Sequence, residues 1–251
     1  MKKIVSMLMI ATMALSLVAC NSSDYKKGVE AFDNGNWDEA IEIFAALGEY
    51  EDSAEKLGDS CAKKAADLYA QGNTKEAVEA ISSHNITEEG KKVLAKILSD
   101  KAQKIIDEST NGLNYYNNYL STVTSDIKMK MFTQNEFTID YDTIVDENDV
   151  NVIAAKASSE AISKMNEELQ ELFESVITAS DKALYEAYEE LKSFSTWTAG
   201  FLSPSGMSGS IMLSIAGTQA GIVNDSDSLT PSNLAKKATS LRAKINALNT
   251  K

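Results

Sequence analysis

The sequence predicts an all-α fold in which helical hairpins are followed by an antiparallel helical bundle. Only two prolines occur in 251 residues, so long stretches contain no residue that breaks a helix. Apolar residues recur at intervals of three and four over most of the chain, which is the spacing of one helix face. The composition, 43% hydrophobic and 24% charged, is that of an ordinary globular protein of one or two domains.

The net charge restricts the partners that the protein can bind. The formal charge is −13, and Arg242 is the only arginine. Affinity for nucleic acid comes mainly from Lys and Arg side chains that neutralise phosphates. We therefore expect no nucleic-acid partner and no broad basic face for anionic lipid.

Residues 1–19 have the layout of an export signal. Lys2 and Lys3 precede an uncharged apolar run from Ile4 to Ala19, which is shorter than the roughly 20 residues of a transmembrane helix. We therefore leave this segment out of the predicted fold.

The end of this segment, Leu17-Val18-Ala19-Cys20, resembles the lipobox of bacterial lipoproteins. The resemblance implies cleavage before Cys20, a thioether-linked diacylglyceryl group on Cys20, and a chain anchored by lipid to the extracytoplasmic face of the cell membrane. Residues 20–23 would form a polar tether, and loss of the two signal lysines would bring the charge to −15. The alternative is an ordinary secretory signal in which Cys20 has no special role.

Residues 24–110 contain two similar units. Gly35 and Gly72, and likewise Ala40 and Ala77, are separated by the same offset of 37 residues. In each unit an asparagine follows the glycine, a combination that ends one helix and begins the next. Each unit therefore predicts a helical hairpin. The helix that begins near Thr87 carries a broad apolar stripe and is expected to cover the second hairpin.

This spacing resembles the tetratricopeptide repeat, whose period is about 34 residues. In the first unit the family's intervals are matched by Gly28, Gly35, Trp37, Ala40 and Phe44, whereas the second unit has Thr74 where an aromatic residue is expected. The resemblance implies either a docking scaffold or a receptor for peptides. Trp37, Tyr50 and Tyr69 are the candidate partner-binding residues, and the alternative for each is a place in the core.

Residues 111–251 predict a bundle of helices. Leu113, Tyr116 and Leu120 begin a run with alternating steps of three and four residues, and a longer run extends from Ile162 to Ala183. Thr230-Pro231 is a good start for a last helix. The alternation of polar and apolar residues from Gln134 to Asp149 favours an extended connection.

One stretch, from Ser193 to Asn224, contains no charged residue. The first interpretation is a buried hairpin at the end of the bundle, in which small residues permit close contact between helices. The alternative is a surface that dips into a membrane or binds a partner.

The sequence predicts no catalytic residue, no metal site and no cofactor. His84 is the only histidine, and it lies in a predicted loop without the partners that a triad or a zinc site requires. Cys61 lies among alanines and is expected to be a small buried hydrophobe. The acidic residues between Asp140 and Asp149 lack the spacing of an EF-hand, and weak calcium binding is the alternative to a solvated loop.

These observations predict a membrane-anchored, noncatalytic adaptor or scaffold that binds an unidentified protein or peptide. The alternatives are a solute-binding lipoprotein, which usually has two α/β lobes, and an envelope-acting enzyme that uses an acidic pair.

Overall fold

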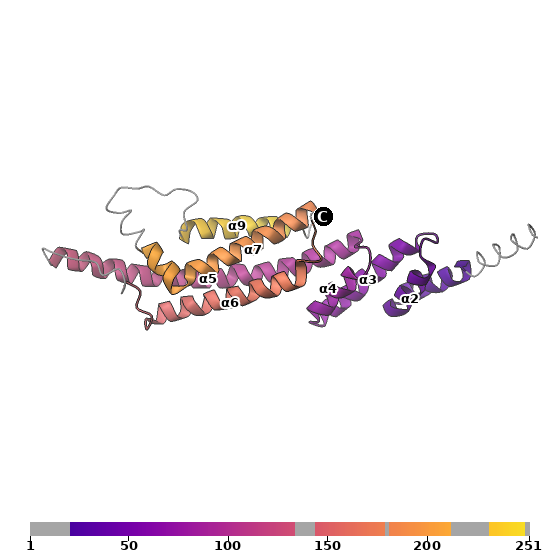
Figure 1. Cartoon of the computed structure of the whole chain (residues 1–251), viewed down its shortest axis with the longest axis horizontal. Coiled ribbons are helices and arrows are strands. Elements are labelled where there is room, and N and C mark those ends of the chain that lie inside the picture. Colours follow the sequence, from indigo (N-terminus) through magenta and orange to yellow (C-terminus); the bar gives the residue numbers. More distant parts are fainter. Residues whose placement is uncertain (1–20, 134–143, 179–180, 212–230, 249–251) are drawn as a thin grey trace, which may run out of the picture. The chain divides into compact units, whose positions relative to one another are not determined.

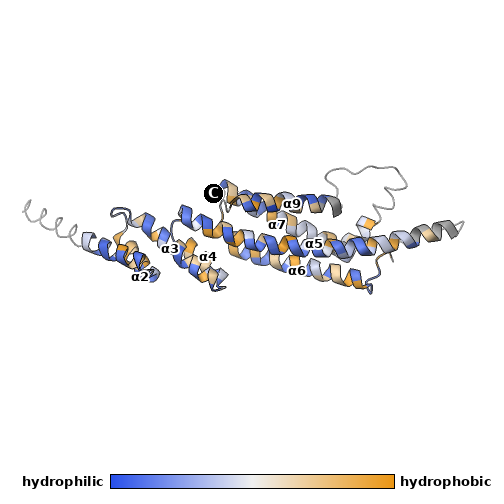
Figure 2. Cartoon of the chain, turned by 180° about the vertical axis from the view of Figure 1, so that it is seen from behind, coloured by the Kyte–Doolittle hydropathy of each residue, from blue (hydrophilic) through white to orange (hydrophobic). Residues whose placement is uncertain are grey.

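The computed structural model describes residues 21–133, 144–178, 181–211 and 231–248, and every regular element in these ranges is an α-helix (Figure 1). The prediction of an all-α fold is therefore confirmed. Hydrophobic and hydrophilic residues intersperse along each helix in Figure 2, as is typical of amphipathic helices that each bury one face.

The helices divide between two compact units, Met1–Ile97 and Leu98–Lys251. The first unit contains a helix over 21–33, α2 (Trp37–Leu47), α3 (Ser53–Ala70), α4 (Thr74–Ser82) and the start of α5 (Glu88–Thr133). The second contains the rest of α5, α6 (Val150–Phe173), α7 (Lys182–Leu202), a helix over 204–211 and α9 (Pro231–Leu248). The division falls inside α5, whereas we expected a boundary after residue 110.

The helix over 21–33 and α2 form the first hairpin. Phe44 and Ala40 of α2 are fully buried. A Cβ atom on Gly28 would lie only 2.9 Å from Cε1 of Phe44, so the two helices approach as closely as the small residue allows. Gly28 and Ala40 thus have the packing role that the sequence predicted. The described helix includes residues 21–23, which we had expected to form a tether.

The turns of the two hairpins have the same geometry. Gly35 and Gly72 have φ angles of 75° and 89°, and the amide of the residue after each glycine donates a hydrogen bond of 2.9 Å to the carbonyl five residues earlier. This Schellman motif requires a left-handed residue, which glycine adopts without steric cost. Asn36 and Asn73 occupy the predicted N-cap positions, but neither side chain accepts a capping hydrogen bond.

Helix α5 runs without a break through Gly112. A Cβ atom on Gly112 would lie 2.3 Å from Cδ1 of Leu202 and 2.9 Å from Cβ of Ser158. At Gly112, inside the helix, Ser158 of α6 and Leu202 of α7 therefore pack directly against the backbone of α5.

The second unit is an antiparallel bundle. Between α6 and α7, Ser159 bonds to the carbonyl of Ala199 at 2.6 Å and Asn166 accepts from Ser195 at 2.7 Å, so residue numbers rise on one helix as they fall on the other. The same inverse order holds between α5 and α6, whose contacts include Lys101–Glu168 at 3.0 Å and Glu108–Ser158 at 2.6 Å. It holds again between α7 and α9, where Trp197 stacks with Lys237 and Glu190 pairs with Lys244.

The apolar run that we followed from Ile162 to Ala183 does not form one helix. Helix α6 ends at Phe173, α7 begins at Lys182, and Ala183 is exposed. A heptad pattern cannot show where a chain reverses, because the spacing continues by chance across the turn. By contrast, the last helix begins at Pro231 as predicted.

The described part of the uncharged stretch, residues 193–211, is buried in part. It includes the end of α7 and the helix over 204–211, and its buried residues are Phe194, Ser195, Thr198, Ala199, Phe201, Leu202, Met207 and Ile211. These residues contribute to the core of the bundle, while residues 212–224, which the predicted hairpin includes, lie outside the described ranges. Cys20 and Asp140 lie outside them as well.

Candidate functional site

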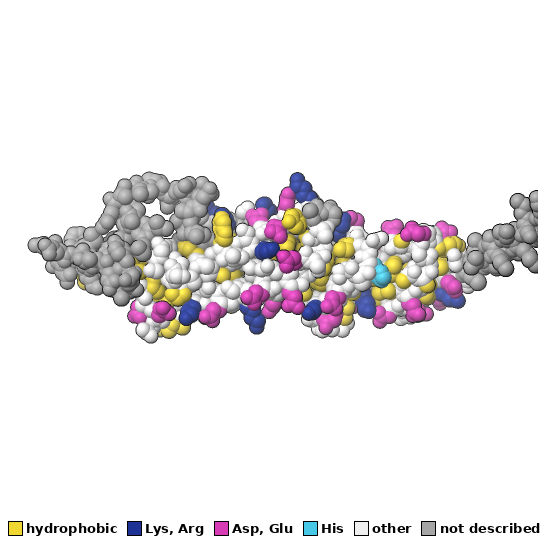
Figure 3. All heavy atoms as spheres, viewed as in Figure 1, with side chains coloured by type: hydrophobic (Ala, Val, Ile, Leu, Met, Phe, Trp, Pro, Cys, Tyr) yellow, Lys and Arg dark blue, Asp and Glu magenta, His cyan; other side chains and the backbone are white. Residues whose placement is uncertain are grey.

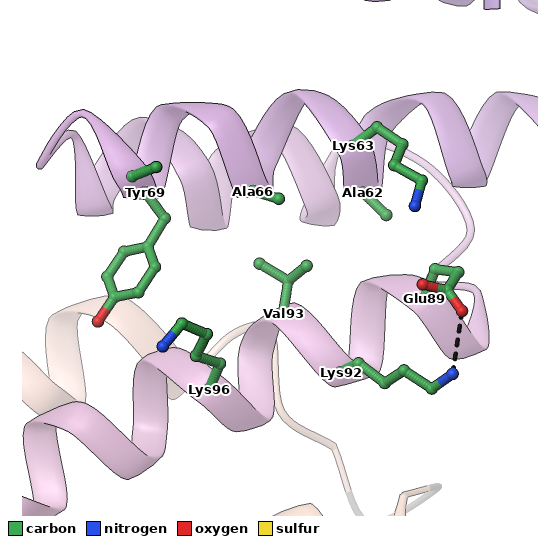
Figure 4. A pocket seen from close by; sticks show the side chains of 9 residues that line it. Ala62, Lys63, Ala66, Tyr69, Glu89, Lys92, Val93 and Lys96 are labelled. Atoms are coloured by element: carbon green, nitrogen blue, oxygen red, sulfur yellow. Dashed lines mark hydrogen bonds and ion pairs between the residues drawn. The ribbon is translucent and has the colours of Figure 1, made fainter. Parts of the chain in front are cut away.

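The candidate functional site is a groove in the first unit. Its volume is about 580 Å³, and α3 and the first turns of α5 line it (Figure 4). The lining residues are Ala62, Lys63, Ala66, Tyr69 and Ala70 of α3 and Glu89, Lys92, Val93 and Lys96 of α5. We refer to it below as the α3–α5 groove.

The floor of the groove follows from small residues at helical spacing. Ala62, Ala66 and Ala70 lie four residues apart on α3, so they share one face of that helix. An alanine side chain ends at Cβ, and three of them in a row leave space that longer side chains would fill. Val93 of α5 points toward Ala66 across this space (Figure 4). The floor is therefore apolar and shallow.

Lysines form the rim of the groove. Lys63 comes from α3, and Lys92 and Lys96 come from α5 at a spacing that places both on the groove side. Glu89 is the only acidic residue of the lining, so the lining carries a charge of +2 in a protein whose total charge is −13. Asp and Glu side chains are scattered over the face of the molecule that Figure 3 shows.

Glu89 is held by the lysines of the same rim. Nζ of Lys92 donates a hydrogen bond to Oε1 of Glu89 at 3.0 Å. This hydrogen bond, the charge of Lys92 and the charge of Lys63 lower the pKa of the Glu89 carboxyl group. Glu89 is therefore an ionised carboxylate that competes for Lys92 with any other anion in the groove.

Tyr69 and Lys96 close the other end of the groove. Nζ of Lys96 lies 6.0 Å from the centre of the Tyr69 ring, a distance at which the cation is attracted to the ring face. The Tyr69 side chain is half-buried and extends from α3 toward α5 (Figure 4). Of the three residues proposed to bind a partner, Tyr69 is the one that lines this groove.

Trp37 lies at a different place in the first unit. Its indole Nε1 donates a hydrogen bond of 2.7 Å to Oδ2 of Asp67, and its ring packs edge-on against Phe32. Asp67 and Tyr69 are two residues apart on α3, and side chains at that spacing point to different sides of a helix. Trp37 therefore joins the first hairpin to α3 and does not line the groove.

Tyr50 belongs to an aromatic cluster in the first hairpin. The Tyr25 ring packs edge-on against both Tyr50 and Phe44, at 6.0 and 6.1 Å between ring centres. The Tyr25 hydroxyl donates a hydrogen bond of 2.5 Å to Oδ1 of Asp52, which raises the pKa of Tyr25 to about 12. Hence the structure does not bring Trp37, Tyr50 and Tyr69 together into one surface.

The sequence reasoning missed the lysines of the groove. Their signal was available, since Lys92 and Lys96 lie four residues apart and a matching stripe of alanines occurs in α3. The pairing of these two faces could not be predicted, because a helix periodicity does not identify the partner helix.

No protein-family model, curated protein or solved structure matches the chain. The site must therefore be interpreted from its own geometry.

Within the described ranges, no helix is long and apolar enough to cross a membrane. No group of three or more His, Cys, Asp or Glu side chains in the same ranges is placed to hold a metal ion. His84 is exposed in the loop between α4 and α5, and Cys61 is buried, which raises the pKa of its thiol.

Proposed function

We propose that the protein is a lipid-anchored adaptor that binds a partner protein at the extracytoplasmic face of a cell membrane without catalysing a reaction. The observation that carries this proposal is the α3–α5 groove, in which an apolar floor is bordered by cationic side chains. Such a surface offers hydrophobic contact and charge recognition together, the combination that peptide-binding sites use.

The proposed location of the adaptor at the membrane depends on the resemblance of Leu17-Val18-Ala19-Cys20 to a lipobox. Each buried methylene of an attached acyl chain contributes about 0.8 kcal/mol to membrane binding, so two chains on Cys20 would hold the protein stably. The anchor would concentrate the groove at the membrane, and the partner would be held there.

The helical architecture favours an adaptor over a solute receptor. Solute-binding lipoproteins usually have two α/β lobes, whereas all regular elements of the described residues are helices. The hairpins of the first unit also share the turn geometry at Gly35 and Gly72. This similarity supports, within the proposal, a tetratricopeptide-like segment, a class whose members usually bind peptides or proteins.

The anchor can be tested with the full chain expressed in bacteria. We expect the wild-type protein to incorporate labelled palmitate and to sediment with membranes, and the Cys20→Ser variant to lose both properties. Equal sedimentation and labelling of the variant would refute the lipid anchor. Mass spectrometry of the mature N-terminus gives an independent measurement of the attached group.

The partner-binding role can be tested by photocrosslinking in the same cells. A benzoyl-phenylalanine at position 69 would replace an aromatic residue of the groove, and one at position 185 would replace Tyr185 of α7, which is 37% exposed and lies outside it. We expect a discrete adduct from position 69 alone. Absence of adducts at both positions, or the same adducts at both, would contradict the proposal.

A further inference from the structure

We propose that the α3–α5 groove binds an acidic peptide segment of the partner, in which two carboxylate side chains flank an apolar one. This inference rests on the proposed adaptor function and adds the chemistry of the segment that is recognised. Three features of the groove support this inference. They are the positions of the lysines, the apolar floor between them, and the positive charge of the lining within a unit whose net charge is negative.

The lysines occupy both ends of the groove. Lys63 and Lys92 lie at the end near Glu89, and Lys96 lies at the end near Tyr69 (Figure 4). A ligand with one carboxylate at each end would meet a cation at both positions. The long, flexible lysine side chains tolerate variation in the exact position of these carboxylates.

The floor between the two ends has no charged side chain. Ala66 and Val93 offer only methyl groups to a ligand that lies between the lysines, and the Ala62 side chain is buried. An apolar side chain of the ligand would be removed from water there, whereas a polar one would lose hydrogen bonds to water without replacement. The middle position of the bound segment is therefore expected to be apolar.

The length of the groove fits a short segment. Lys63 and Tyr69 are six residues apart on α3, which corresponds to about 9 Å at the helical rise of about 1.5 Å per residue. An extended chain advances about 3.3 Å per residue, so about three to four residues would span this distance.

The charge of the whole unit favours a peptide over an anionic membrane surface. Residues 21–97 contain 9 lysines and 16 acidic residues, so the unit has a charge of −7 although the groove lining has +2. A flat anionic bilayer would face this acidic surface as well as the groove and would be repelled by it. A segment of a few residues enters the groove alone.

The test uses the purified full chain and an array of hexapeptides in which each position is varied through all amino acids. We expect binding to select Asp or Glu at two positions, one on each side of an apolar residue. Peptides with Asn or Gln at these two positions should not be selected. The enriched peptide is then resynthesised with a fluorescent label, and its affinity for each variant is measured by anisotropy.

The variants predict opposite changes in affinity. Lys63→Gln with Lys96→Gln should weaken binding about five- to tenfold, because two exposed charge contacts are lost. Glu89→Gln should strengthen it about two- to threefold, because it removes the carboxylate that competes for Lys92. The control Lys26→Gln changes an exposed lysine of the helix over 21–33 and should have no effect. Circular dichroism verifies that all variants stay folded.

Three results would overturn the inference: no enrichment of acidic residues, equal binding by the Lys63→Gln, Lys96→Gln protein, or lysine-dependent binding of phosphatidylglycerol vesicles in place of peptide. The proposed function can survive its failure. A crosslink at position 69 to a partner with no acidic preference would keep the adaptor and reject the acidic segment, whereas absence of any crosslink would reject the adaptor itself.

Discussion

Trp37 and Asp67 join α2 and α3, two helices that we predicted from the sequence to belong to different hairpins. The indole Nε1 of Trp37, at the first residue of α2, donates to Oδ2 of Asp67 near the end of α3 at 2.7 Å. Nζ of Lys64 reaches Asp38 across the same two helices at 2.5 Å. Trp37 therefore has a structural partner inside the first unit, in addition to its edge-on contact with Phe32.

This contact predicts a moderate stability loss for Trp37→Phe. The substitution keeps an aromatic ring against Phe32 and removes the hydrogen bond, which should lower the free energy of local opening by about 1 kcal/mol. Native-state hydrogen exchange of the α2 and α3 amides measures this change. If Asp67→Ala costs the same amount and the double variant costs no more, the hydrogen bond is responsible; independent, additive losses would contradict it.

Gly112 and Gly200 should respond oppositely to alanine. Gly112→Ala would place a Cβ atom 2.3 Å from Leu202, so we expect a loss of about 1–3 kcal/mol in the free energy of unfolding, although alanine favours helices. Among the described residues, and apart from the backbone of its own helix and its two chain neighbours, no atom lies within 4 Å of such a Cβ on Gly200 in α7. Gly200→Ala should therefore be neutral or stabilise by about 0.5–1 kcal/mol. Urea unfolding of both variants checks this pair, and equal effects would disprove the packing argument.

Two buried tyrosines should differ on replacement by phenylalanine. Within the described residues the Tyr188 hydroxyl is buried without a hydrogen-bond partner, whereas the Tyr116 hydroxyl lies 2.8 Å from that of Ser210. Tyr188→Phe should thus be neutral or stabilise slightly, and Tyr116→Phe should cost about 1 kcal/mol. Thermal unfolding at neutral pH compares them. A greater loss for Tyr188→Phe would show that its hydroxyl has a partner after all.

The pKa of Tyr188 adds a pH dependence. Burial, followed by the charges of Glu174 and Glu189, raises the pKa of Tyr188 to about 12. Because the folded state holds this proton more tightly than the unfolded state, the stabilisation is fully present below pH 10 and is lost as the pH rises toward about 12. Stability measured between pH 9 and 12 should fall less steeply for Tyr188→Phe than for the wild type. Parallel curves would contradict the assignment.

Asn166 should be more important for the register of α6 and α7 than for their stability. Its amide group accepts from Ser195 at 2.7 Å and donates to Thr196 at 3.1 Å. We expect Asn166→Ala to cost about 2 kcal/mol, because it leaves the buried hydroxyl group of Ser195 with fewer partners, and Asn166→Leu to restore much of that loss. Hydrogen exchange and sedimentation should then show a less uniquely packed bundle for Asn166→Leu. A sharp, monomeric and fully protected Asn166→Leu bundle would contradict the role in register.

The sequence by itself determined the helices and their local boundaries. The positive φ angles at Gly35 and Gly72, the start of α9 at Pro231 and the buried apolar faces all follow from interactions within a few residues, which local patterns record directly. Local patterns also led to an error. The apolar run that we followed to Ala183 continued across the turn between α6 and α7.

Only the tertiary structure decided which faces meet. Trp37, Tyr50 and Tyr69 look equivalent in the sequence as candidates for partner binding or for the core. In the structure the first bonds to Asp67, the second joins an aromatic cluster, and the third lines the α3–α5 groove. The sequence likewise does not show that Lys63 of α3 and Lys96 of α5 border the same groove. Helical periodicity records that a face is apolar or charged but not which distant face packs against it, because that choice depends on the shapes and charges of both partners.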